Sequence, residues 1–259
     1  MSTTEAQTRA DEVPELSVVI PVHDEADNIL PLLQEIETAL SGRVRFEVVV
    51  VDDGSRDETP ARLSEALSAM PFLRVLRHER QAGQSRAIWN GVRAARAPWI
   101  ATLDGDGQND PGDIPKLLAE RERLGGEVGL LAGWRVHRRD SAWKRFGSRL
   151  ANAVRGWLLK DRTPDTGCGL KLFRRDAFLE LPYFDHMHRF LPALFQREGW
   201  LTRSIPVGHR PRRAGRSHYG NLRRLWVGLA DLGGVAWLLR RRRRTAVHEI
   251  GPSRIGEHP

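Results

Sequence analysis

The residues best suited to chemistry in this sequence are Asp104, Asp106 and Gln108, which single glycines separate. Alternate residues of an extended segment project to one side, so two carboxylates and an amide oxygen can meet one hard cation such as Mg²⁺ or Mn²⁺. A cation in that place would bridge the two phosphates of a nucleoside diphosphate and stabilise it as a leaving group. Because Asp and Gly also favour turns, a plain acidic turn is the alternative interpretation.

Two other acidic segments follow short apolar runs. Residues 23–25 follow the run 16–22, and the pair 52–53 follows the run 46–51. These runs, together with 73–77 and 99–103, are short and mostly apolar, which predicts buried strands. Ligands of a parallel sheet bind outside the carboxyl ends of its strands, so the three acidic loops are expected to converge on one crevice.

Helical patterns separate the expected strands. Apolar residues recur at helical spacing over 27–40, 59–70 and 84–95, with Asp27 or Asn28 as the expected cap of the first helix. Strands of five to seven residues that alternate with such helices predict βαβ units, a largely parallel sheet and the α/β class.

Composition narrows the class of protein. The 259 residues suit one substantial domain, and the single cysteine excludes a disulfide framework and fits a reducing compartment. Residues 1–15 are polar, with no signal-peptide pattern, and no run of about 18 apolar residues predicts a membrane-spanning helix. The net charge of +8 implies an anionic partner: phosphate, nucleic acid or a membrane surface. Neither a glycine-rich dinucleotide fingerprint nor a Walker loop is present.

Four segments together resemble the family 2 glycosyltransferases of the GT-A fold, in their dolichol-phosphate mannose synthase-like branch. They are residues 19–25, residues 51–55, the helix start at Gly83, and residues 104–113. The resemblance implies a Rossmann-like, mostly parallel sheet flanked by helices, over residues 16–220. Residues 1–15 and 245–259 are expected to be disordered tails, with an amphipathic helix and a polybasic end over 221–244.

The resemblance also implies an activity, which is inverting transfer of a sugar from GDP-mannose or a UDP-sugar to undecaprenyl or dolichyl phosphate. Asp53 could instead cap a helix, and Gly83 could be an ordinary turn glycine. The histidine at position 23 leaves the choice of base open. The residues that would bind the nucleotide-sugar are Pro21, His23, Glu25, Asp53, Ser55, Gly83, Asp104 and Asp106.

Arginines carry the acceptor side of this hypothesis. A polyprenyl phosphate is already ionised at neutral pH, so it needs charge neutralisation and orientation rather than a general base. The resemblance places Arg135, Arg145, Arg212 and Ser217 at the acceptor phosphate, and the three arginines join Asp106 as the catalytic set. The alternative is a solvated helix face at 135–149 and a solvated loop at 209–219.

Two smaller groups of residues are less decisive. Asp165 lies in a glycine-punctuated turn before an expected short strand, and is either a sugar ligand or a structural residue. Asp185, His186 and His188 are expected to begin a helix on the acceptor side rather than to form a metal site.

The segment 222–239 is mostly apolar, with Asp231 in its middle, and five arginines follow it. It is expected to lie on the cytoplasmic face of the inner membrane as a peripheral helix. The alternatives are a core helix, a homodimer interface or contact with an integral-membrane partner.

Two other functions compete with lipid glycosylation. The first is a family 2 transferase with a saccharide acceptor in cell-envelope polysaccharide synthesis, which would need a catalytic carboxylate near the acceptor. The second is nucleic-acid binding, which the charge allows but which gives no reason for three acidic loops at strand ends, so no nucleic-acid partner is expected.

Overall fold

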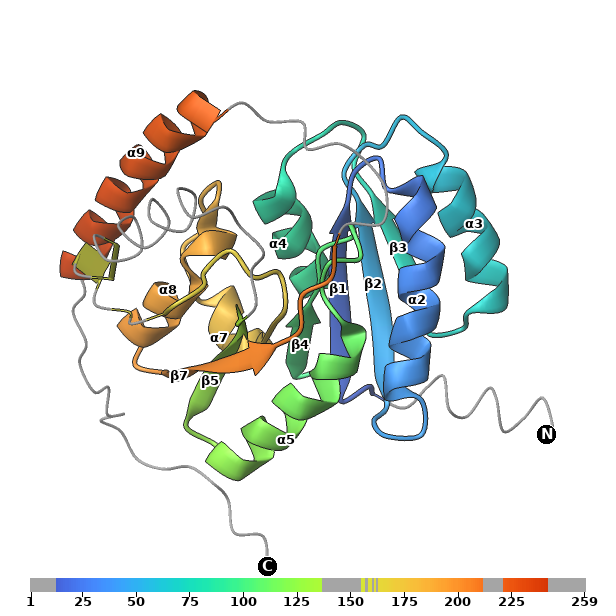
Figure 1. The fold of residues 1–259 in the computed structure, drawn as a ribbon, viewed down its shortest axis with the longest axis horizontal. Helices are drawn as coiled ribbons and strands as arrows, with labels where there is room; N and C mark the ends of the chain where they lie inside the picture. The colour runs from blue at the N-terminus through green and yellow to red at the C-terminus, as the bar shows by residue number, and fades with distance from the viewer. Residues whose placement is uncertain are drawn as a thin grey trace, which may run out of the picture.

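The structure is a computed structural model, which describes residues 13–136, 155–156, 158–159, 161, 163–211 and 221–241. Seven strands form one sheet in the order β3-β2-β1-β4-β6-β5-β7 (Figure 1). Their bounds are β1 Leu16–Val22, β2 Phe46–Asp52, β3 Leu73–Arg77, β4 Trp99–Thr102, β5 Val128–Arg135, β6 Lys171–Arg174 and β7 Leu201–Val207. The four strands predicted from the first hundred residues are confirmed, with ends within one residue.

The sheet is mostly parallel, as predicted. Strand β1 pairs in parallel with β2 and β4, β2 with β3, and β5 with β7. Only β6 among the described strands runs the other way, antiparallel to both β4 and β5. Lys171, its first residue, is therefore in register with Thr102, the last residue of β4. The beginning of β6 thus lies at the edge where the parallel strands end.

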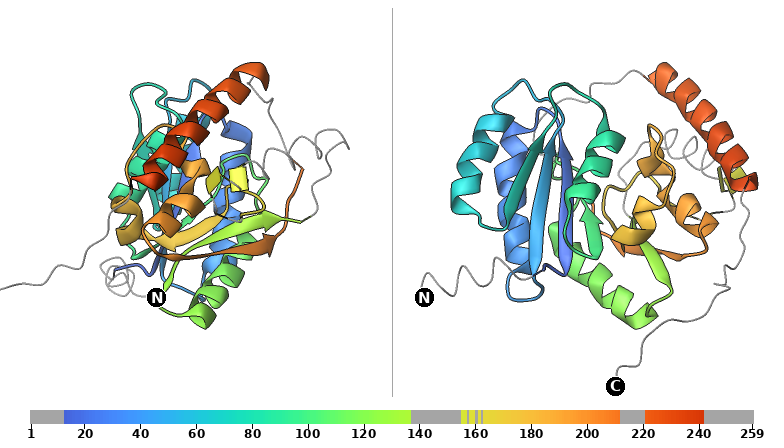
Figure 2. Two further views of the ribbon diagram at one scale, coloured as in Figure 1. Left: turned by 90° about the vertical axis from the view of Figure 1, so that its left-hand side faces the viewer. Right: turned by 180° about the vertical axis from the view of Figure 1, so that it is seen from behind.

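Helices cover both faces of the sheet (Figures 1 and 2). One face carries α2 (Ala26–Leu40), α3 (Thr59–Ala69) and α5 (Ile114–Leu124), and the other carries α4 (Gln84–Ala94), α7 (Arg175–Leu179), α8 (Leu191–Arg197) and α9 (Asn221–Arg240). Two short 3₁₀ helices, η1 (Pro111–Asp113) and η2 (Met187–Arg189), precede α5 and α8. Successive residues of β1 point to opposite faces. Val18 therefore joins the first apolar cluster, which lies under α2, α3 and α5, and Val19 joins the second apolar cluster, which lies under α4, α7, α8 and α9.

The prediction that Asp27 or Asn28 caps α2 is wrong. The helix begins at Ala26, whose amide donates to Asp57 Oδ2 (3.1 Å), and the preceding Glu25 amide donates to Thr59 Oγ1 (2.9 Å). The cap therefore comes from the loop after β2, which is distant in sequence and close in space. Local sequence alone does not show such a cap.

At the end of the sheet where β1 and β2 begin, the buried carboxylate of Glu47 of β2 connects three segments of the chain. Its carboxylate accepts from Ser17 Oγ (2.6 Å), the Arg96 amide (2.6 Å) and the Arg74 guanidinium (2.8 Å). Burial by itself would raise the pKa of Glu47, but these three hydrogen bonds outweigh it and the pKa is lowered. Glu47 is therefore held as a charged carboxylate.

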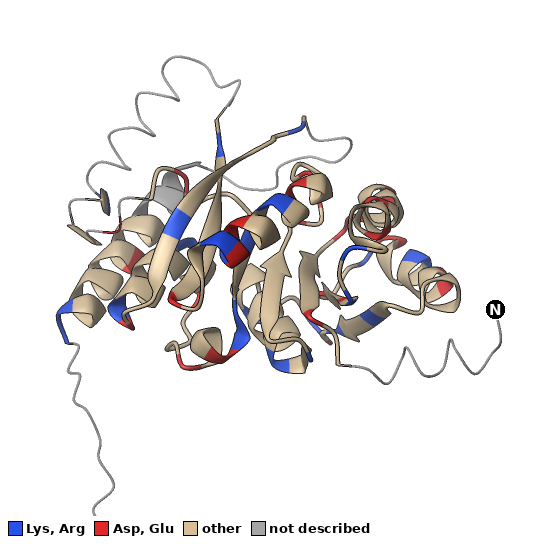
Figure 3. Cartoon of the chain, turned by 90° about the horizontal axis from the view of Figure 1, so that it is seen from below, with Lys and Arg blue, Asp and Glu red and all other residues tan. Residues whose placement is uncertain are grey.

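Helix α9 covers the segment 222–239, for which a helix was predicted, and its described side chains lie on two different faces. Val235 and Ala236 are buried in the second apolar cluster, and the carboxylate of Asp231 lies 2.9 Å from His186 Nδ1. Leu229 and Trp237, 48% and 59% exposed, face away from the protein. In the described chain, no helix combines the length and apolarity needed to span a bilayer. Basic and acidic residues are interspersed over the described elements (Figure 3).

Candidate active site

The loops after β1 and β2 are joined by hydrogen bonds where the two strands end. His23 Nδ1 donates to the carbonyl oxygen of Asp53 (2.9 Å), and the amide of Asp24 donates to Ser55 Oγ (3.0 Å). Asp24 has a positive φ of 55°, and its carboxylate accepts from the Arg56 amide (2.8 Å). The acidic loops expected to meet in one crevice are thus in direct contact.

Asp53 connects this pair of loops to the start of α4. Its buried carboxylate accepts from His78 Nδ1 (2.7 Å) and from the amides of Ala82 and Gly83 (2.8 Å each). The alternative that Asp53 caps α3 is wrong, because Asp57 binds the Thr59 amide there (2.9 Å). Asp53 instead fixes the loop that leads into α4, and its contact with a nucleotide stays a prediction.

Two glycines are required by the backbone of these loops. Gly54 has a φ of 73°, and a Cβ on it would lie 2.8 Å from the backbone nitrogen of Gln81. Gly83 has a φ of 92° at the N-terminus of α4, a conformation that residues with a side chain rarely adopt. Gly83 thus has a conformational reason to be glycine, whether or not a nucleotide lies against it.

The other predicted donor residues line or support the same edge. Pro21 is buried within β1, and the Glu25 carboxylate accepts from Asn28 Nδ2 (2.6 Å). Ser55 is buried, and its amide donates to Asp52 Oδ1 (2.8 Å). The structure brings these residues together, while their contacts with a nucleotide stay predictions.

Asp104 and Asp106 lie in the loop after β4, beside the others. Asp104 Oδ1 accepts from Gln84 Nε2 of α4 (2.8 Å), and Asp106 Oδ1 accepts from the Gln108 amide (3.1 Å). Burial and the neighbouring Asp106 raise the pKa of Asp104, against the pull of Lys171. Asp106 therefore lies close enough to Asp104 to disfavour the charge on Asp104.

This pair fits a divalent cation that arrives with a diphosphate. Within the described ranges, no group of three or more His, Cys, Asp or Glu side chains could hold a metal by itself. Mg²⁺ is commonly held by one or two carboxylates, with substrate phosphates and water as its other ligands. Asp104 and Asp106 supply such a partial set, and a cation beside them would offset their mutual repulsion. A role for the Gln108 side chain as a third ligand stays a prediction.

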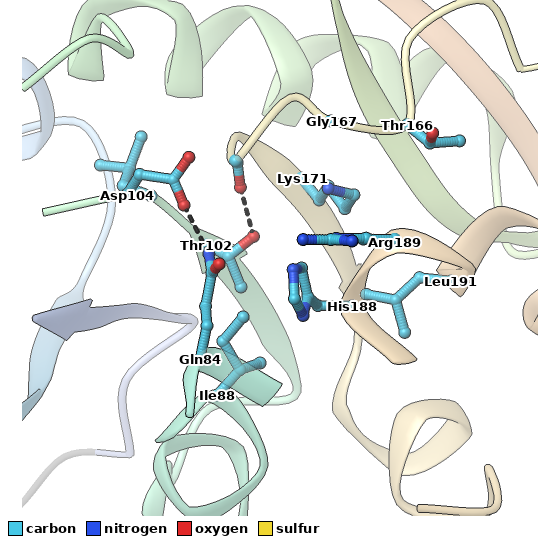
Figure 4. Close-up of a pocket in the computed structure, with 12 residues that line it drawn as sticks. Gln84, Ile88, Thr102, Asp104, Thr166, Gly167, Lys171, His188, Arg189 and Leu191 are labelled. Atoms are coloured by element: carbon cyan, nitrogen blue, oxygen red, sulfur yellow. Dashed lines mark hydrogen bonds between the residues drawn. The ribbon is translucent and has the colours of Figure 1, made fainter. Parts of the chain in front are cut away.

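A pocket of about 270 Å³ opens between α4, the start of β6 and η2 (Figure 4). Lys171 is buried in its wall, and its Nζ donates to the carbonyl of Cys168. Burial lowers the pKa of Lys171, while Cys168 and Asp104 act in the opposite direction. Polar residues that line the pocket include Gln84, Asp104, Thr166, Lys171, His188 and Arg189.

The histidines before α8 have separate partners. His188 Nδ1 lies 2.7 Å from Ser85 Oγ of α4, and burial, with Lys171 and Arg189 nearby, holds its pKa well below the ordinary value. His186 pairs with Asp231 of α9. The predicted helix start in this segment is confirmed as η2, which α8 follows after one residue.

Arg135, predicted to bind the acceptor phosphate, is already paired. Its Nε and Nη2 donate to the two oxygens of Asp165 at 2.7 and 2.8 Å, and both side chains are largely buried. The pairing of β5 with β6 brings these residues together across 30 positions of sequence. Asp165 thus has a structural partner, and a role of Arg135 toward a phosphate stays a prediction. Arg145, Arg212 and Ser217 lie outside the described residues.

The sequence patterns did not single out several polar pocket residues as site residues, among them Gln84, Lys171 and Arg189. Gln84 directly follows the glycine of a recognised motif, and Lys171 ends the glycine-punctuated turn, so both carried a local signal. Arg189 carried none beyond its neighbour His188.

Comparison with known proteins places the chain in a family. The model described as "Glycosyl transferase family 2" matches residues 17–181. Dodecaprenyl-phosphate galacturonate synthase of Rhizobium johnstonii is 34% identical over 253 residues, 93% of this chain and 72% of that protein. Undecaprenyl-phosphate 4-deoxy-4-formamido-L-arabinose transferase of Pseudomonas fluorescens is 36% identical over 211 residues, 80% of this chain. The chain spans only 61% of the length of this second relative.

Solved structures share the fold. Glucosyl-3-phosphoglycerate synthase of Mycobacterium tuberculosis, in complex with Mn²⁺, UDP and glucosyl-3-phosphoglycerate, superposes with a TM-score of 0.61 at 18% identity, over 93% of this chain and 82% of that one. The mannosyltransferase PcManGT of Pyrobaculum calidifontis, in complex with GDP-Man and Mn²⁺, gives 0.63 at 20% identity, over 92% and 67%. From its motifs, its sheet and these matches, the chain belongs to glycosyltransferase family 2 and has the GT-A fold.

Proposed function

We propose that the protein transfers one sugar, with inversion, from a nucleotide-sugar to a polyprenyl phosphate, with Mg²⁺ or Mn²⁺ as cofactor. The observation that carries this proposal is the carboxylate pair Asp104 and Asp106 at the sheet edge where the loops after β1, β2 and β4 meet. Two relatives named for polyprenyl-phosphate products support the acceptor class. Solved neighbours that hold Mn²⁺ with a nucleotide support the cofactor.

The chemistry asks little of the protein beyond charge and orientation. Asp104 and Asp106 would hold the cation, which offsets the charge of the donor diphosphate. An oxygen of the acceptor phosphate attacks the anomeric carbon on the face opposite the diphosphate, and the bond from that carbon to the diphosphate oxygen breaks. The nucleoside diphosphate leaves with the electron pair. Because the acceptor oxygen is already ionised, no proton has to be removed.

The acceptor phosphate needs cations other than Arg135 alone, because Asp165 offsets much of that charge. We assign this role to Arg145 and Arg212 as well, with the Ser217 hydroxyl as a hydrogen-bond donor to the same phosphate. Residues 208–211, which directly precede Arg212 in the sequence, lie beside the loop after β4. The Arg210 guanidinium pairs with Asp110 (2.7 Å) and its amide donates to the Gln108 carbonyl (3.0 Å).

We also propose that the exposed face of α9 rests on the cytoplasmic face of the inner membrane. Leu229 and Trp237 are exposed there, and Arg240 and Arg241 follow at the helix end. Asp231 does not oppose this orientation, because it points to His186 within the protein. Apolar side chains with flanking arginines are typical of helices that lie on anionic lipid.

Vesicle sedimentation tests the membrane contact. Replacing Leu229 and Trp237 together by alanine should release most of the protein from anionic vesicles at low salt. Leu67→Ala on α3, which is 46% exposed, is the matched control and should not change binding. Equal vesicle binding by the double variant and the wild type would remove α9 from the membrane contact.

Product analysis tests the reaction itself. The protein is incubated with Mn²⁺, a panel of UDP- and GDP-sugars and undecaprenyl phosphate, and the lipid fraction is analysed by mass spectrometry. We expect one sugar-phosphate lipid, and none with Asp106→Ala. Sugar incorporated only into an added saccharide, with the lipid unchanged, would support the saccharide-acceptor alternative instead.

A further inference from the structure

Arg189 presents a positive charge to the pocket, and the described part of the chain gives it no negative partner. Among the described residues, its guanidinium has neither a hydrogen-bond partner nor an ion-pair partner. Figure 4 shows the side chain lying between Lys171 and His188 and pointing across the pocket toward Thr102. Every other arginine discussed above at this site, Arg135 and Arg210, is paired with a carboxylate.

The backbone holds Arg189 in this orientation. Met187, Phe190 and Leu191 are at most 5% exposed and anchor the segment in the second apolar cluster. His188 is held by Ser85 of α4 through a bond of 2.7 Å. With the apolar residues on either side fixed in the core, Arg189 has its place at the pocket wall.

The charges around the pocket do not balance. Among the described residues that line the pocket, Asp104 is the one acidic side chain, whereas Lys171 and Arg189 are two basic ones. His188 is neutral, since burial and the nearby cations lower its pKa. The charge of Arg189 is left over, and a partly desolvated guanidinium is stabilised best by two-bond contact with an oxyanion.

The size of the pocket limits what that oxyanion belongs to. At about 270 Å³, it is near the lower limit of ligand pockets, roughly 300 Å³. It suits a monosaccharide unit or a phosphate group but not a complete nucleotide-sugar. The pocket wall includes Asp104. The pocket therefore opens beside the loop after β4, where the transferred sugar and the acceptor would meet.

We propose that Arg189 is a specificity-determining residue that binds an oxyanion of a substrate beside Asp104. The oxyanion is the carboxylate of an acidic donor sugar or the phosphate of the acceptor, which share the same recognition chemistry. This inference rests on the proposed function, because it takes the pocket as the place of sugar transfer.

Binding and kinetics with Arg189→Gln separate the two sources. Dissociation constants are measured with Mn²⁺ for UDP, UDP-galactose and UDP-galacturonate, and for GDP, GDP-mannose and GDP-mannuronate. If the sugar carries the oxyanion, the variant binds the uronate about tenfold to a hundredfold more weakly. Its affinities for the nucleotide and for the neutral sugar stay within twofold. If the acceptor carries it, all these constants stay unchanged and the KM for undecaprenyl phosphate rises by a similar factor.

The controls make the result specific. Arg62→Gln removes an exposed arginine of α3 and should match the wild type in every measurement. Arg189→Lys keeps the positive charge and should recover part of the lost affinity. If Arg189→Gln unfolds at a lower temperature than the wild type, Arg189→Lys is used in its place. Unchanged uronate binding and unchanged KM, or an equal loss of affinity for UDP itself, overturn the proposal. Failure of the wild type to make any glycolipid refutes the proposed function, whereas the nucleotide-sugar constants still test Arg189.

Discussion

Replacing Gly169 by alanine should displace Asp104 and nearly abolish activity. A Cβ on Gly169 would lie 2.3 Å from Asp104 Oδ2 and 2.7 Å from Asn109 Oδ1. Ordinary contact begins at 3.4 Å, so the carboxylate has to move by about 1 Å (3.4 minus 2.3). A misplacement of about 1 Å can lower the rate roughly 100-fold, and such overpacking costs about 1–3 kcal/mol of stability.

A second glycine separates the loss of activity from the loss of stability. A Cβ on Gly129 of β5 would lie 2.4 Å from the Cβ of Trp200, an equally severe clash in another part of the sheet. Gly129→Ala should therefore lose stability but keep its turnover per folded molecule. The assays are thermal unfolding, Mn²⁺-dependent nucleotide binding and turnover with a polyprenyl phosphate. Wild-type turnover by Gly169→Ala, or an equal loss in Gly129→Ala, would show that Gly169 does not position Asp104.

The remaining predictions concern single charged groups. Asp106→Asn should lose metal-dependent nucleotide binding while its unfolding temperature stays near that of the wild type, and chelator-resistant binding would contradict the metal assignment. The pKa of Glu47 is lowered in the folded state, so the ionised carboxylate adds to the free energy of unfolding. This contribution is fully present above the ordinary pKa of 4.5 and is lost as the pH falls through the pKa of the folded state. Urea unfolding should thus show Glu47→Gln about 2 kcal/mol less stable at pH 7, with the difference shrinking below pH 4.5; a pH-independent difference would refute this. Asp165→Asn should lower the free energy of unfolding by about 3 kcal/mol, because it leaves the Arg135 guanidinium buried without its carboxylate. Replacing both residues by apolar ones should recover most of that loss in denaturant unfolding. If the double variant recovers nothing, the loss does not come from the broken ion pair.

The first hundred residues were predictable because their signals are local. Apolar runs such as 16–22 alternate with amphipathic segments, and the acidic residues sit directly after the strands. The rule that sites lie at the carboxyl ends of parallel strands then brings Asp53 and Asp104 to one edge. What could not be predicted there was the cap of α2, because Asp57 and Thr59 reach it from another loop.

The second half of the site depends on pairings that no local pattern contains. Arg135 meets Asp165 because β5 lies next to β6, although the two strands are far apart in the sequence. Arg189 reaches the pocket because its apolar neighbours are buried against helices from both halves of the chain. A run of arginines in the sequence does not say which of them are paired and which remain available to a ligand.

The reversed direction of β6 divides the site between two supports. The acidic loops stand on the ends of β1, β2 and β4, whereas the pocket beside Asp104 is completed by the beginning of β6 and by η2. Thr166 and Gly167 line the pocket, so a change at these residues alters its wall without touching the strands that carry the acidic loops, whereas Gly169 lies against Asp104 and has to stay glycine. On the proposed function, a change at these two positions would alter which sugar is accepted while the nucleotide stays the same, and it offers the protein engineer a short segment to randomise.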